Sequence, residues 1–331
     1  STPAENRRLV PSDFRLIGGW RLAQEYPRGG LAIDFDSGRV FVGGHAQRQE
    51  VVEFSLMHRS DETEETERIP LGTGDDVMKW PTLDPVKVHT GFWEGGYVGG
   101  LYVKDDTLWA SPKKFYDMKP PSSFHLYGKN LDTGKVETVL VELPRQEFGG
   151  GFVKGKPDTI LLGCGGYESG QGSVSGPTLA TIDGKALIRQ ANHGTMDFEK
   201  RELRPPNYWP AKRVDGWLAL QPRDGIGRWA CDRVHAGGIW HRRGIAYWAL
   251  LGIGDLDYAR QNETFAARNE TWLYTYDPKT YGGVEFNKWD HGHVHGHEVA
   301  EDGRVYLLIR NAWRSGRARV DSVIKVFEIV D

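Results

Sequence analysis

The segment "WDHGHVHGHEV", Trp289 to Val299, places four of the chain's 11 histidines at every second position: His291, His293, His295 and His297. Alternate side chains of an extended strand point to the same face, so we expect all four imidazoles to share one face. The neighbouring pair His293 and His295 suits a divalent metal, Zn²⁺ or Ca²⁺. Either His235 or Glu147 would supply the third ligand.

Two other interpretations of these histidines stay open. Imidazoles beside tyrosine and arginine side chains can transfer protons without any metal. They can also simply hydrogen-bond to backbone and water in a polar channel. This alternative stays open because a single His-x-His pair is only a moderately specific signal of a metal site. We expect His291 and His297 to be structural or exposed to solvent.

Carboxylates elsewhere in the chain suit a different reaction, the hydrolysis of a glycosidic bond. That reaction needs an acid and a base or nucleophile facing each other across the bond, and we assign this pair to Glu147 and Asp232. His235 and Tyr97 complete the expected catalytic set, and either would be the base if the enzyme were a polysaccharide lyase. The residues expected to bind substrate are aromatic, basic or polar: Trp93, Arg233, Arg310, His45, Tyr167 and Lys113.

A repeated pattern predicts the elements that position these residues. Each copy has a small-residue opening, an apolar strand, a tight polar turn and a more apolar strand. The copies are "RGGLAIDFDSGRVFVGG", "VGGLYVKDDTLWAS", "GGGFVKGKPDTILLG", "AGGIWHRRGIAYWAL" and "HEVAEDGRVYLLI". A third and usually a fourth strand follows each hairpin. In the first copy we expect the fourth strand at "ETERIPL".

Four-stranded units that repeat in this way predict an all-β fold, a five-bladed β-propeller that forms one domain over residues 1–331. The expected blades cover roughly residues 29–71, 97–143, 147–191, 233–288 and 295–331. The last copy lacks a fourth strand, and residues 13–22 would supply it and so close the ring. A two-sheet sandwich is the alternative, although it has no reason to repeat one glycine-rich opening.

In such a ring the first strand of each blade lines the channel, and the second strand returns to the same end. The start of one strand and the end of the next should therefore meet at the channel mouth. This geometry brings together residues that are far apart in the chain, such as Glu147, His235 and His295.

The composition of the chain limits the kinds of partner that we expect it to bind. A net charge of −3 over 331 residues does not suit a protein that coats nucleic acid, and no apolar run is long enough for a membrane span. The 42 glycines and 12 tryptophans suit tight turns and sugar-sized stacking surfaces. We expect a monomer.

The predicted blade number resembles that of the five-bladed propellers, which include glycoside hydrolases of the arabinanase and levansucrase type. The resemblance covers the whole chain at the level of architecture. Those enzymes carry an aspartate at the start of the first blade, where this chain has Pro27 and Arg28. A channel mouth with His, Tyr, Arg and a metal is also similar to that of polysaccharide lyases.

These observations together predict a secreted or periplasmic enzyme that cleaves glycosidic bonds of a poly- or oligosaccharide, with hydrolysis ahead of lyase chemistry. In the lyase variant Arg233 would hold the uronate group of the substrate. The alternative from another class is a non-catalytic propeller that binds sugar or acts as a scaffold.

Overall fold

The computed structural model describes residues 8–25, 30–44, 48–59, 80–93, 97–113, 123–141, 151–154, 159–163, 179–183, 233–240, 244–251, 270–276, 285–315 and 319–330. Apart from one 3-10 turn, η2 (Pro11–Asp13), every regular element in these ranges is a β-strand. The all-β prediction is confirmed. Within the same ranges no helix has the length and apolar character needed to cross a membrane.

The largest sheet has eight strands in the order β17-β18-β19-β1-β5-β4-β3-β2. Their bounds are β1 (Phe14–Glu25), β2 (Leu31–Asp34), β3 (Arg39–Gly43), β4 (Glu50–Arg59), β5 (Thr82–Thr90), β17 (His293–Val299), β18 (Val305–Ser315) and β19 (Arg319–Ile329). This sheet consists of two antiparallel units. In the sheet they are joined where β1 and β5 run parallel, through the pairs Arg21–Thr82 and Leu22–Leu83.

The other two sheets consist of one and two antiparallel units. A four-stranded sheet contains β6 (Tyr97–Lys104), β7 (Thr107–Lys113), β8 (Phe124–Asn130) and β9 (Val136–Val141) in chain order. A seven-stranded sheet has the order β12-β11-β10-β13-β14-β15-β16. Its strands are β10 (Gly151–Lys154), β11 (Thr159–Gly163), β12 (Leu179–Asp183), β13 (Arg233–Trp240), β14 (Gly244–Leu251), β15 (Glu270–Tyr276) and β16 (Glu285–Trp289).

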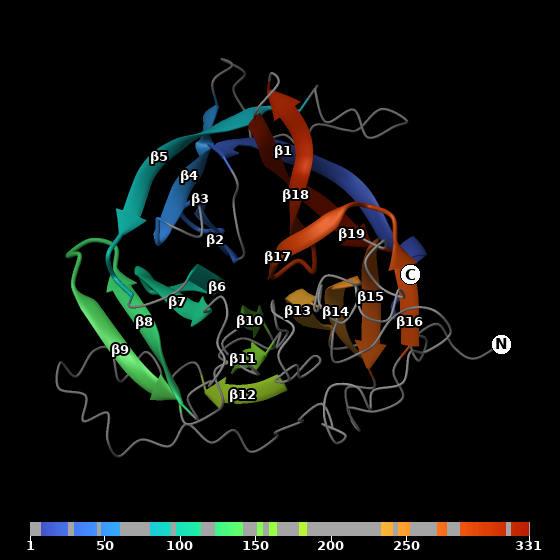
Figure 1. The fold of residues 1–331 in the computed structure, drawn as a ribbon. Coiled ribbons are helices and arrows are strands. Elements are labelled where there is room, and N and C mark those ends of the chain that lie inside the picture. The colour runs from blue at the N-terminus through green and yellow to red at the C-terminus, as the bar shows by residue number, and fades with distance from the viewer. Residues whose placement is uncertain are drawn as a thin grey trace, which may run out of the picture.

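The antiparallel units are arranged around a common axis. The first strand of each unit lies innermost, and each inner strand contacts the next around the ring, in the order β2, β6, β10, β13, β17 and back to β2 (Figure 1). A ring of small sheets whose inner strands meet in this way is a β-propeller arrangement, in which sheet edges are short and covered.

The N-terminal strand completes the last unit, as predicted. β1 pairs antiparallel with β19 from Phe14–Ile329 to Glu25–Asp321, so the two ends of the chain share one sheet. The fourth strand of the first unit differs from the prediction, because it is β5 at Thr82–Thr90. The segment "ETERIPL" lies outside the described residues. In the sequence, Pro85 argues against a strand at this position, because proline has no backbone amide to donate. The outermost strand of a unit tolerates it.

The hydrophobic cores lie between adjacent sheets. Between the last and first units, Leu308 and Ile324 pack with Leu31, Ile33 and other apolar residues. A second core lies between the first unit and the β6–β9 sheet, and a third between the last unit and β15–β16. The first and last units are therefore apolar on both faces, and sheet-on-sheet packing stabilises this part of the ring.

The hairpin turns at the ends of the inner strands differ in how they reverse the chain. The β2–β3 and β17–β18 turns use glycines in the left-handed region, Gly38 at φ 70° and Gly303 at φ 85°. The β6–β7 turn instead uses Asp105 and Asp106, at φ 48° and 56°. A two-residue hairpin turn favours this backbone conformation, which aspartate tolerates better than most residues.

The last and first inner strands approach each other closely where the ring closes. The amide of Gly30 donates a hydrogen bond to the carbonyl of His295 at 3.2 Å. A β-carbon placed on Gly296 would lie 2.7 Å from the Leu31 Cβ and 2.9 Å from the Leu31 amide nitrogen. Glycine is therefore required at position 296 by the backbone opposite it.

We expect Gly296→Ala to destabilise the protein by about 1–3 kcal/mol, because the added methyl group would force β17 away from β2. The free energy of unfolding from urea titration measures this effect. Gly134→Asn is the matched control. Gly134 has φ 73° and no neighbour within 4 Å, and asparagine tolerates this conformation. Equal losses in the two variants would contradict the close approach.

Candidate interaction surface

The four histidines of the opening segment do not share a face, so that prediction is wrong. β17 begins only at His293, and the ring of His291 packs between Trp289 and Phe327 at centroid distances of 4.9 and 5.1 Å. The register of β17 on β18 also shifts between Val294 and Gly296, which marks a bulge at His295. A bulge adds one residue to a strand and so breaks its alternation.

The bulge separates the remaining histidines. Val294 pairs with Ile309 and His297 pairs with Leu307, so Val294 and His297 lie on the same face of the sheet. His293 is adjacent to Val294 and therefore lies on the opposite face. His295 is 4% exposed and His297 is also buried, whereas His293 is half-buried.

Several predicted site residues do begin or end strands at one end of the ring. Tyr97 starts β6 and pairs with Lys113 at the end of β7. His293 starts β17 and pairs with Arg310. Arg233 and His235 lie at the start of β13, which contacts β17. Of these residues only the His293 side chain is among those that the structure describes. The roles assigned to the others stay predictions.

Glu147, Asp232, His45 and Tyr167 lie outside the described residues. Within the described part of the chain no three His, Cys, Asp or Glu side chains gather to hold a metal. The proposed metal ligands include Glu147 and the His235 side chain, so the metal site stays a prediction.

Trp93 is placed differently from the prediction. It is 4% exposed and packs edge-to-face on Phe92, with ring centroids 4.8 Å apart, in the core between the first unit and the β6–β9 sheet. An indole buried in this way offers no open face on which a sugar ring could stack. The alternative of ordinary packing between blades explains this tryptophan.

Glu298 is fully buried and has a structural role. Its Oε2 accepts a hydrogen bond from the amide of Ile33 on β2 at 3.2 Å, and its Oε1 accepts one from the amide of Val299 at 3.0 Å. The carboxylate therefore links the last inner strand to the first. A buried acceptor that is used in this way stabilises the ring and is not open to a substrate.

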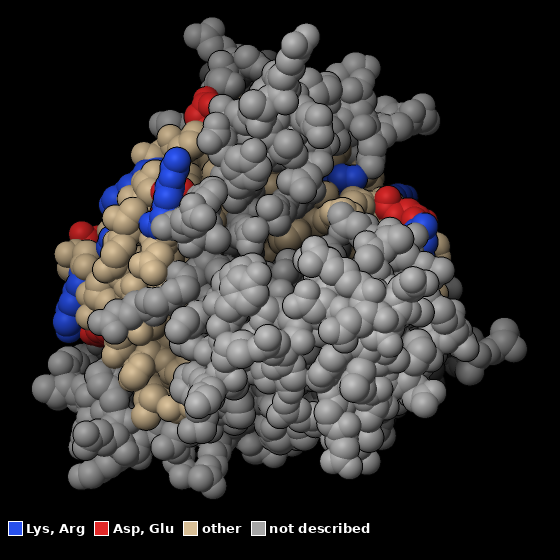
Figure 2. Space-filling model, viewed as in Figure 1, with Lys and Arg blue, Asp and Glu red and all other residues tan. Residues whose placement is uncertain are grey.

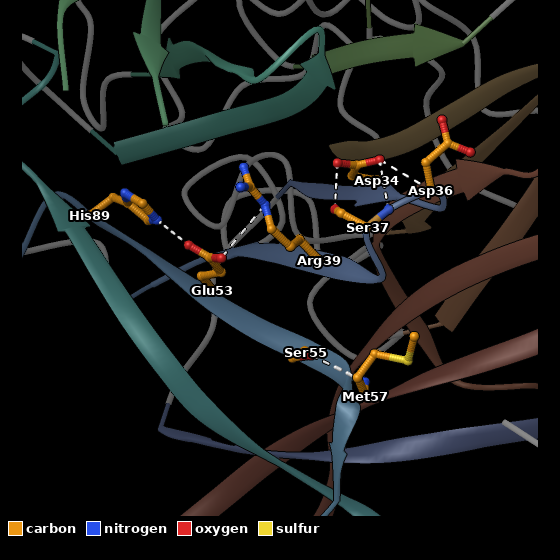
Figure 3. Close-up of polar contacts among 8 residues, drawn as sticks. All are labelled: Asp34, Asp36, Ser37, Arg39, Glu53, Ser55, Met57 and His89. Carbon is orange, nitrogen blue, oxygen red and sulfur yellow. Dashed lines mark hydrogen bonds and ion pairs between the residues drawn. The ribbon is translucent and has the colours of Figure 1, made fainter. Parts of the chain in front are cut away.

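The first unit also contains a polar cluster that the sequence pattern does not indicate. Glu53 of β4 accepts a hydrogen bond from the Nε2 of His89 on β5 at 2.7 Å, and its other oxygen lies 3.7 Å from the Nε of Arg39 on β3 (Figure 3). Burial by itself raises the pKa of Glu53. The hydrogen bond and charge of His89, with the charges of Arg39 and Lys87, outweigh burial and lower that pKa below 4.5.

The Arg39–Glu53–His89 cluster is built by strand register. Glu53 pairs with Phe41, and Val51 pairs with His89, so the cluster lies on the same sheet face as the core that packs against β6–β9. Nothing in the spacing of these residues along the sequence indicates the contact. Its closed, buried geometry indicates a structural pair rather than a catalytic one.

The described residues expose an apolar surface at the ring closure, which we call the seam surface: Phe35 and Met57 with the half-buried Trp20 and Leu56. Beneath it, the ring of Tyr306 stacks on Trp20 at 6.4 Å and contacts Phe35 at 5.1 Å. Phe35 is 39% exposed, and Met57 is 68% exposed.

The two exposed residues flank the same turn. Phe35 lies within the β2–β3 turn, and the Leu56 amide donates a hydrogen bond to the Gly38 carbonyl of that turn at 2.8 Å. The next residue, Met57, has its Cγ 3.5 Å from the position of a β-carbon on Gly38. Phe35 and Met57 therefore lie beside the same β2–β3 turn, Phe35 against Tyr306 and Met57 against Gly38.

A second exposed apolar strip is protected. Val86 and Val88 on the outer strand β5 are exposed, but the same strand carries the exposed Lys87, and Pro85 removes a backbone donor. Basic side chains lie over β5 on the face that Figure 2 shows. Lysine and proline on an outer strand prevent pairing with another chain. This strip is therefore a weaker candidate than the seam surface.

No family model matches the chain, and no curated protein matches it. The WD40 β-propeller domain of Doa1 is similar in structure, with a TM-score of 0.34 and 7% identity over 90% of this chain and 78% of that chain. The β-propeller domain of Myceliophteria thermophila Cps50 (Swd1) has a TM-score of 0.35 and 8% identity, and the match covers 93% and 73% of the two chains. Scores this low carry no argument about function. The ring is established by its own strand contacts.

The prediction of an enzyme that cleaves glycosidic bonds, as hydrolase or lyase, is corrected. In the described residues, the buried carboxylate of Glu298 bonds to backbone amides, and Trp93 lies in a core. The non-catalytic alternative fits these findings better.

We expect Glu298→Ala to lower the free energy of unfolding by about 1–3 kcal/mol, because the buried Ile33 amide would lose its acceptor. Glu298→Gln keeps one carbonyl oxygen and should cost less. The exposed neighbour Glu301 provides the control, and Glu301→Ala should change stability by less than about 0.5 kcal/mol. Urea titration of the three variants measures the difference. A Glu298→Ala variant as stable as Glu301→Ala would remove the structural role.

The stabilising effect of Glu53 should depend on pH. Its pKa is lower in the folded protein than the ordinary 4.5, so its contribution is present above pH 4.5 and is lost as the pH falls through the folded pKa. Glu53→Gln should therefore be less stable than wild type at pH 7, and the difference should shrink in acid. The control is Glu137→Gln, which removes a surface pair with Lys135. A pH-independent difference for Glu53→Gln would contradict this assignment.

Proposed function

We propose that the chain is a non-catalytic five-bladed β-propeller that binds a protein partner. The blade number is supported by the cycle of contacts from β2 through β6, β10, β13 and β17 back to β2. Each of these strands begins one antiparallel unit, and β1 supplies the outermost strand of the last unit. Under this proposal the ring is a rigid support, and function belongs to its surface.

The observation that carries the binding role is the seam surface. Phe35 stands exposed over a packed pair of rings, Trp20 and Tyr306, that continues into the core, and Met57 is exposed beside the same β2–β3 turn. A large aromatic side chain held by its neighbours loses little conformational freedom on binding, and methionine adapts to irregular partners. This combination is typical of a protein-binding surface.

The same residues favour a protein over a carbohydrate. Phenyl and thioether groups bury apolar area but offer no strong hydrogen-bonding group for sugar hydroxyls. The tryptophan assigned to sugar stacking, Trp93, is buried. The predicted secreted or periplasmic location rested on the carbohydrate function and stays a prediction.

A display selection of a random peptide library against the purified chain tests this function. We expect enrichment of one or a few sequence families whose binding is competed by soluble chain. In parallel, a panel of polysaccharides is incubated with the chain and assayed for reducing ends and near-ultraviolet absorbance. Absence of any competed peptide family, or turnover of a polysaccharide, would overturn the proposal.

A further inference from the structure

The charged residues around the seam surface indicate the chemical class of its protein partner. This inference rests on the proposed binding function. Carboxylates lie close to the apolar residues in the sequence. Asp36 follows Phe35 in the β2–β3 turn, and Glu301 and Asp302 lie in the β17–β18 turn, four to five residues before Tyr306. Ala300, which precedes Glu301, packs against the same core as Trp20 and Leu56. Both turns therefore lie at the edge of the seam surface.

The charges in these turns are unbalanced. Asp34 ends β2 just before the β2–β3 turn, and its carboxylate accepts hydrogen bonds from the amides of Asp36 and Ser37 and from the Ser37 hydroxyl. The basic side chain in the two turns is Arg304, whose Nη1 lies 3.1 Å from Asp302. Among the described residues, Asp36 and Glu301 make no ion pair, and both are exposed.

The neighbouring inner turn adds to the same charge. β2 contacts β6, so the β6–β7 turn lies next to the β2–β3 turn at the same end of the ring. Asp105 and Asp106 form that turn and are exposed. This turn therefore adds two carboxylates at the same end of the ring, beside Lys104 at the end of β6.

We propose that the seam surface docks a basic protein segment in which an apolar side chain, flanked by lysine or arginine, packs against Phe35 and Met57. Charge complementarity identifies this occupant, because carboxylates around an apolar centre attract cationic groups and repel acidic ones. The apolar contacts would hold the complex together. The carboxylates would speed association and select against acidic segments.

The peptides enriched on the wild-type chain are labelled with a fluorophore, and their affinity and association rate are measured with four proteins. These are wild type, Phe35→Ser/Met57→Ser, Asp36→Asn/Glu301→Gln and the control Val136→Ser. Val136 is an exposed apolar residue on β9, away from the seam surface. All changed side chains are exposed, and circular dichroism with the unfolding midpoint verifies that each variant is folded.

We expect the enriched peptides to be rich in lysine and arginine around an apolar residue. Phe35→Ser/Met57→Ser should weaken their binding by about tenfold or more, and Val136→Ser should leave it unchanged. Asp36→Asn/Glu301→Gln should slow association and flatten the loss of affinity between about 50 and 300 mM salt.

The outcomes separate this inference from the function on which it rests. Enriched peptides without an excess of basic residues, or with equal affinity for wild type and Phe35→Ser/Met57→Ser, would overturn the inference and leave a protein-binding propeller in place. Absence of any competed peptide family would remove both.

Discussion

Ring closure is the constraint on which the rest of this structure depends. The last inner strand must lie against the first, and three contacts hold them together. The Gly30 amide bonds to the His295 carbonyl, Gly296 packs without a side chain against Leu31, and the Glu298 carboxylate accepts a hydrogen bond from the Ile33 amide. Because these contacts join opposite ends of the chain, each requires the whole ring to be assembled. The pairing of β1 with β19 seals the same unit from the outside.

This constraint explains why the polar residues of β17 do not form the site that their spacing indicates. The bulge at His295 accompanies the close approach of β17 to β2 and reverses the alternation beyond it. His297 and Glu298 then become buried, and the Glu298 carboxylate satisfies a backbone amide of the neighbouring unit. The spacing of the polar residues in β17 indicates a chemical site, but in the folded chain these residues mainly hold the ring together.

The same closure creates the surface to which we assign function. Trp20 from the N-terminal strand, Tyr306 from the C-terminal region and Phe35 from the first hairpin meet only because the ring brings their strands together. No segment of the chain contains this aromatic group by itself. Its position at the junction of the first and last units ties any partner that binds there to the closed form of the ring.

Part of the fold could be predicted because the hairpins are local. A glycine-rich opening, an apolar run and a turn such as the one at Asp34–Gly38 each act through near neighbours, so repetition of the pattern reveals repeating units. The N-terminal strand was predictable because the last unit lacked a partner for β19. The fourth strand of the first unit was not predicted, because β5 contains Pro85. Proline is tolerated in an outer strand, but the sequence does not show that β5 is one.

The candidate sites were less predictable, and the reason is physical. The Glu53–His89 contact depends on the register between β4 and β5, and the orientation of the histidines in β17 depends on one extra residue in a strand. Register and bulges are decided by how sheets pack on each other, over distances that a sequence pattern does not measure.

The sequence by itself determined that this chain is all-β, that it repeats a hairpin unit and that its two ends belong to one sheet, because these properties arise from local turn chemistry and alternation. Only the tertiary structure decided which polar residues are buried and which apolar residues remain exposed. Burial is a property of the closed ring, in which each side chain meets neighbours supplied by distant parts of the chain.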